Sequence, residues 1–120
     1  MKTENLIQEK SYAFAIRIVN LYRYLTEEKK EYVLSKQVLR SGTSIGANIE
    51  EGIGGQSEKD FYAKLCIAYK EARETKFWLR LLRDTNYLTE KEANAIIVDC
   101  DEILKIITAI INTMKKKLNK

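Results

Sequence analysis

The sequence contains no histidine and no proline, only two cysteines and only five glycines among its 120 residues. Without histidine, the commonest general base and the commonest metal ligand are both missing. The lack of proline and the scarcity of glycine argue against turn-rich all-β folds and favour a few long helices. No apolar run approaches the roughly 18 residues of a membrane span, and the start lacks the apolar block of a signal peptide. We therefore expect a cytoplasmic protein with no membrane contact.

The excess of positive charge lies at the C-terminal end of the chain, because residues 1–114 hold 17 basic and 17 acidic side chains. Hydrophobic residues make up 45% and charged residues 32%, which predicts one folded domain over residues 1–120. The net charge is +4, and four lysines stand within the last six residues: Lys115, Lys116, Lys117 and Lys120. This cluster is a candidate nucleic-acid contact. It is equally a common end to a helix, where cations complement the negative end of the dipole, and the residues alone favour that interpretation.

Four segments carry helical periodicity, and short polar linkers separate them. Ser57 followed by Asp60, and Thr89 followed by Glu92, are typical of helix N-termini. The pair Gly54-Gly55 predicts a helix end with left-handed backbone. Short linkers make neighbouring helices antiparallel, so we predict an all-α, up-down-up-down four-helix bundle. The expected helices cover about 4–25, 32–53, 58–84 and 90–116.

Two of the predicted helices carry more apolar residues than one core-facing stripe needs. The fourth adds Val98, Ile106 and Ala109, and the first adds a second set of four: Tyr12, Ile16, Val19 and Tyr22. Large exposed apolar patches are avoided in soluble monomers, so this pattern predicts a homo-oligomer.

Polar residues form a row along the second predicted helix. Five of them follow at spacings of three or four: Gln37, Ser41, Ser44, Asn48 and Glu51. Arg40 lies at the edge of this row, and Glu71 and Glu74 lie in a similar row of the third helix, so Arg40 could pair with either carboxylate. The candidate residues are Arg40, Ser44, Asn48, Glu51, Glu71 and Glu74. They form either a recognition site or a structural network that fixes helix register, and the second interpretation is favoured.

The sequence lacks the residue patterns that common classes of enzyme need. A bundle dimetal site needs Glu-x-x-His pairs, and the sequence GIGG at 52–55 lacks the lysine and spacing of a phosphate-binding loop. Cys66 and Cys100 lie in apolar helical patterns without a partner base, which predicts buried free thiols. We therefore expect no catalytic residues, no metal and no cofactor.

Two blocks of sequence resemble a known family. The stretch SIGANIEEG at 44–52, preceded by QVLR at 37–40, is similar to the signature of the 23S rRNA-intervening sequence proteins, also called S23 proteins. The block EARET at 71–75, with Trp78-Leu79 and Tyr87-Leu88, resembles one branch of that family.

The resemblance implies a four-helix bundle that assembles into a homopentameric ring with a central opening. It also implies kinship with the accessory variability protein of diversity-generating retroelements, a pentamer that works with nucleic acid and a reverse transcriptase. The family has no agreed activity. Two functions follow as expectations: a ring that binds RNA or a ribonucleoprotein weakly, or a structural scaffold for a protein partner.

Overall fold

The chain forms four long helices. The structure is a computed structural model and describes residues 2–119. The helices are α1 (Lys2–Glu27), α2 (Leu34–Ile53), α3 (Glu58–Asp84) and α4 (Glu90–Leu118). The described part of the chain contains no strand, which confirms the all-α prediction. The second helix begins two residues later than expected and the fourth ends two residues later.

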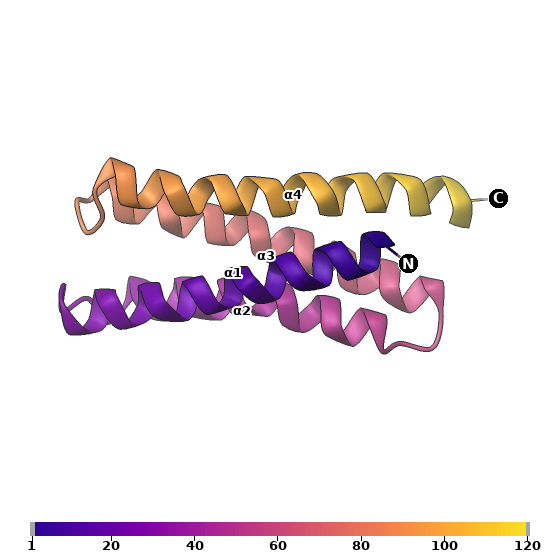
Figure 1. The fold of residues 1–120 in the computed structure, drawn as a ribbon, viewed down its shortest axis with the longest axis horizontal. Coiled ribbons are helices and arrows are strands. Elements are labelled where there is room, and N and C mark those ends of the chain that lie inside the picture. Colours follow the sequence, from indigo (N-terminus) through magenta and orange to yellow (C-terminus); the bar gives the residue numbers. More distant parts are fainter. Residues whose placement is uncertain (1, 120) are drawn as a thin grey trace.

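The helices run up, down, up and down in a rod of 50 × 22 × 21 Å. As Figure 1 shows, consecutive helices lie antiparallel and side by side; α1 also packs against α4, which closes the bundle. The core along the axis is built from one apolar stripe of each helix. Its fully buried large residues include Ile7, Ile18, Leu25, Val38, Ile45, Ile49, Leu65, Leu79, Leu82, Ile103 and Ile107.

The starts of α3 and α4 match the sequence signals. The hydroxyl of Ser57 accepts a hydrogen bond from the amide of Asp60 at 3.1 Å. Thr89 and Glu92 form a full capping box, in which each side chain accepts from the other residue's amide, at 3.1 and 2.9 Å. These contacts satisfy amides that have no partner within the helix.

The start of α2 depends on a residue that lies outside the helix. The carboxylate of Glu31 accepts hydrogen bonds from three backbone amides, those of Val33 (3.1 Å), Leu34 (3.0 Å) and Ser35 (2.6 Å). Only 8% of Glu31 is exposed, and its own carbonyl accepts from the Ser35 hydroxyl at 2.8 Å. The sequence analysis did not identify this cap.

None of the glycines supplies left-handed backbone, and Gly42 instead serves helix packing. Gly54 ends α2 with a φ of −79°, so the left-handed end predicted for the pair Gly54-Gly55 is wrong. Positive φ occurs instead at Lys30 and Asn86, in the two loops at the opposite end of the bundle. A Cβ at Gly42 would lie 2.8 Å from both Cγ atoms of Ile18, closer than real contacts allow. Gly42 therefore lets α1 and α2 approach closely.

Candidate functional site

The polar rows of α2 and α3 meet at Arg40. Its guanidinium forms ion pairs with both Glu71, at 3.1 Å, and Glu74. The indole nitrogen of Trp78, a residue of the same polar row of α3, donates to Glu74 at 2.9 Å and so joins the cluster. The Arg40 side chain is 51% exposed. The cluster is therefore a surface network, in which each ion pair contributes about 0–1 kcal/mol to stability.

The other predicted members of the network do not join Arg40. The side-chain amide of Asn48 donates to the carbonyl and hydroxyl oxygens of Ser44, at 2.9 and 3.0 Å, within α2 itself. Glu51 accepts from Lys64 of α3 at 2.8 Å. The six candidate residues thus fall into three separate groups along the α2–α3 seam.

A buried polar link between α2 and α3 lies beneath this surface network. The Thr75 hydroxyl oxygen is 2.9 Å from the Ser41 hydroxyl oxygen and 2.7 Å from the carbonyl oxygen of Glu71. Both Ser41 and Thr75 have no exposed surface. Spacing placed Ser41 in the α2 row but gave no sign that Thr75 faces it. Since both hydroxyls are satisfied, the link fixes helix register.

The C-terminal lysines lie on an ordered helix. Because α4 continues to Leu118, Lys115, Lys116 and Lys117 occupy its last turns, where cations complement the helix dipole. Lys117 pairs with Glu58 at the start of α3, at 2.6 Å. Lys115 and Lys116 are exposed and form no ion pair within residues 2–119. Lys120, the fourth predicted member, lies outside the described residues.

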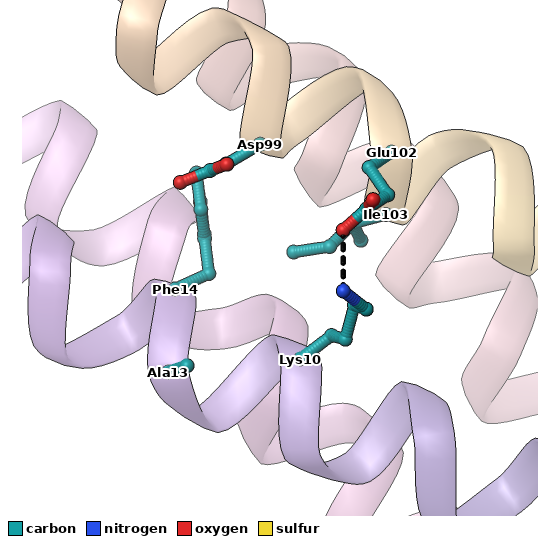
Figure 2. A pocket seen from close by; sticks show the side chains of 6 residues that line it. All are labelled: Lys10, Ala13, Phe14, Asp99, Glu102 and Ile103. Carbon is teal, nitrogen blue, oxygen red and sulfur yellow. Dashed lines mark ion pairs between the residues drawn. The ribbon is translucent and has the colours of Figure 1, made fainter.

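A small hollow separates α1 from α4. It has a volume of about 160 Å³. Lys10 of α1 and Glu102 of α4 form an ion pair at 2.7 Å beside it. Figure 2 shows these two side chains pointing toward one another. Asp99, on the other side, pairs with Arg17 of α1. The hydrogen bond and charge of Glu102 raise the pKa of Lys10. Both carboxylates are therefore engaged by cations of α1, and the polar groups at this hollow connect the two helices.

The two cysteines differ in accessibility. Cys100 is buried, and burial raises the pKa of its thiol to about 12. Its sulfur lies 3.3 Å from the carbonyl oxygen of Ala72. Cys66 is free as well but only half-buried, so the prediction of two buried thiols is wrong for Cys66. Burial thus favours the neutral thiol of Cys100 over the reactive thiolate.

The described residues contain neither a metal cluster nor a membrane span. Among them, no three Asp, Glu or Cys side chains gather in a way that could hold a metal ion. No helix in the same part of the chain combines the length and the apolar character needed to cross a membrane.

Comparison with known proteins identifies a family and a similar crystal structure. Residues 3–109 match the model of a family described as 23S rRNA-intervening sequence protein. A crystal structure of a protein of unknown function from the S23 ribosomal protein family of Bacteroides thetaiotaomicron is similar at 53% sequence identity and a TM-score of 0.90. The match covers 92% of this chain and 98% of that one. No curated protein matches the chain.

Proposed function

Since the chain belongs to the 23S rRNA-intervening sequence protein family, we propose that it is a non-enzymatic RNA-binding protein that acts as a homo-oligomer. The observation that carries the proposal is the lysine cluster at the end of α4, where Lys115 and Lys116 project from an ordered helix without a carboxylate partner among residues 2–119. Such cations gain most from a polyanion, because each phosphate contact releases a counterion.

Self-association would multiply this weak contact. Each subunit brings one lysine cluster, so an oligomer presents several clusters to one RNA and raises avidity without new contacts. The charge balance of residues 1–114 supports binding that is weak and has little sequence preference.

An apolar patch on α1 supports the oligomer. Tyr12 is 65% exposed and Ile16 is 51% exposed. Tyr12 borders a groove of about 260 Å³ that small residues of α2, Gly46 and Ala47, line on the other side. Val98 on α4 is 64% exposed, whereas Val19, Tyr22 and Ile106 are half-buried within the bundle. We propose that a second copy covers Tyr12 and Ile16; five subunits are expected from the family resemblance alone.

Titration of labelled rRNA fragments at two salt concentrations tests the RNA proposal. Replacing Lys115 and Lys116 with glutamine should weaken binding to single-stranded RNA and reduce its salt dependence, by about 0.7 in log–log slope for each phosphate that is no longer neutralised. A matched control replaces Lys36 and Lys91, two exposed lysines at the opposite end of the bundle that form no ion pair within residues 2–119. Absence of binding by the wild-type protein at low salt would contradict the proposal.

Sedimentation equilibrium tests the oligomer separately. We expect the Ile16→Asp variant to sediment as a monomer, because a carboxylate would otherwise be buried in an apolar contact between subunits. Wild-type protein that sediments as a monomer at micromolar concentration would contradict self-association.

The alternative function is a scaffold for a protein partner. Tyr32 and Val33, in the loop between α1 and α2, favour it because they are 54% and 69% exposed at one end of the rod. If the wild-type protein oligomerises but binds no RNA, the scaffold becomes the better interpretation. A substitution at Tyr32 should then leave oligomerisation unchanged.

A further inference from the structure

A groove follows the surface between α3 and α4, on a face that the proposed function does not use. Two hollows of about 520 and 450 Å³ form it, and they share Arg73 and Leu104 in their walls. The first continues past Phe77 to Arg80, and the second continues along α4 past Lys105. Because the two hollows share a wall, an extended ligand could lie along both.

The groove carries more basic than acidic side chains. Of the two carboxylates in its walls, Asp101 is paired with Lys76 at 2.8 Å, and Glu74 is paired with Arg40 outside the groove. Arg73, Arg80 and Lys105 also line it, and none of the three forms an ion pair within residues 2–119. Arg73 and Arg80 lie two turns apart on α3, about 10 Å along the helix axis.

Aromatic rings are interleaved with these cations. Phe77, between the two arginines, is 51% exposed, although burial of such a ring is normally favourable. It is fixed against Trp78 in an edge-to-face contact, with ring centroids 5.1 Å apart and planes at 75°. The indole nitrogen of Trp78 is anchored to Glu74. At the other hollow the Arg73 guanidinium lies 6.0 Å from the ring centroid of Tyr69.

We propose that this α3–α4 groove binds single-stranded RNA, with a base stacked on Phe77 and phosphates contacted by Arg73, Arg80 and Lys105. The inference rests on the proposed function and assigns it a second contact surface. Exposed aromatic rings set among cations are the combination that binds single strands without sequence preference, because every base has a flat face to stack. An acidic peptide without aromatic side chains would satisfy the cations but would leave the exposed face of Phe77 without a stacking partner.

The single tryptophan provides a local reporter of occupancy. Because Trp78 contacts Phe77, a base stacked on Phe77 should change the tryptophan fluorescence when RNA is added. We expect a short single-stranded RNA to produce this change and an RNA duplex to produce little, since paired bases are not available to stack.

Three variants of the full-length protein complete the experiment, with affinity measured by fluorescence anisotropy of a labelled oligonucleotide. Phe77→Leu keeps an apolar side chain against Trp78 but removes the aromatic face, and it should weaken binding by about five- to a hundredfold. The double variant Arg73→Gln with Arg80→Gln should lower the log–log salt slope by about 1.4, for two phosphate contacts. Tyr32→Leu, an exposed aromatic residue in the loop between α1 and α2, is the matched control and should bind as the wild type does.

The outcomes separate this inference from the proposed function. If wild-type protein binds RNA and its affinity falls only on substitution of Lys115 and Lys116, the groove assignment is wrong and the proposed function stands. If polyglutamate changes the Trp78 fluorescence and displaces RNA, the groove is a peptide site and the assignment fails. Dissociation of the oligomer by Phe77→Leu with RNA affinity unchanged would make this face an interface between copies, and would also overturn the assignment. If wild-type protein binds no RNA, both proposals fail together.

Discussion

Replacing Glu31 with glutamine should destabilise the whole bundle, although Glu31 lies in a loop. Its carboxylate accepts from the amides of Val33, Leu34 and Ser35, the first donors of α2. Hydrogen bonds to a charged group contribute about 1.5–3 kcal/mol each, against about 0.5–1.5 kcal/mol for neutral ones. A glutamine keeps one acceptor oxygen and turns an NH₂ group toward an amide that also donates. We therefore expect the free energy of unfolding to fall by about 1–2 kcal/mol.

The pH dependence of this destabilisation identifies the carboxylate as its cause. Burial alone would raise the pKa of Glu31, but the backbone hydrogen bonds of Leu34, Ser35 and Val33 outweigh it and hold the pKa below its ordinary value. A carboxyl whose pKa is lower in the folded state stabilises fully above its unfolded pKa, about 4.3. That stabilisation is lost as the pH falls through the folded-state pKa. The difference between wild type and Glu31→Gln should therefore shrink on acidification.

Urea unfolding followed by far-UV circular dichroism measures both effects. Protein concentration must be the same in every sample, since self-association shifts apparent stability. Glu28→Gln is the matched control, because Glu28 is an exposed carboxylate close by whose side chain caps no helix. Equal stability of wild type and Glu31→Gln near neutral pH, or a difference that stays constant down to about pH 2.5, would refute the reasoning.

Three further predictions concern packing, the surface network and thiol chemistry. Gly42→Ala should lower the free energy of unfolding by about 1–3 kcal/mol, despite the better helix propensity of alanine, because its Cβ would meet Ile18; a stabilised variant in urea unfolding would contradict this. Arg40→Ala should cost less than about 1 kcal/mol in the same assay, since its side chain is half-exposed, and a decrease of about 3 kcal/mol or more would mean that the network is buried in the protein as it exists in solution. A thiol reagent at pH 8 should label Cys66 but spare Cys100, which is buried with its pKa raised to about 12, until denaturant is added; rapid labelling of both thiols in the native protein would contradict the burial.

The fold could be predicted from sequence because its signals are local. The capping residues Ser57 and Thr89 act on amides three positions ahead, and apolar periodicity marks the buried side of each helix. The capping role of Glu31 was not predictable from sequence, because it depends on a loop that folds back onto the first turn of α2. The helix was consequently expected to begin at about residue 32, whereas Leu34 is its first residue.

The candidate site was predictable only in part. The spacing of residues predicts the side of the helix on which a side chain lies, but it does not predict how deeply that side chain is buried in the bundle. It placed Arg40 toward Glu71 and Glu74, which it does contact, but could not tell that the cluster would lie at the surface. It could not tell that Asn48 would bond within its own helix either. The row of Arg73, Phe77 and Arg80 can be read from the sequence of α3 once its outward face is known. The wall that α4 adds, with Leu104 and Lys105, depends on how the two helices pack.

The contact between α1 and α4, which contains the hollow beside Lys10, affects the order in which the four helices pack during folding. Every other helix contact joins neighbours along the chain, so hairpins of α1 with α2, α2 with α3 and α3 with α4 can each form over a short loop. Closure of α1 on α4 brings together the two ends of the sequence and adds two solvent-exposed ion pairs, one of them between Lys10 and Glu102. Because closing a long loop costs more entropy than closing a short one, contacts of such high sequence separation form late in folding. The low contact order of the other helix pairs thus favours rapid folding, and the packing of α1 against α4 is a late step.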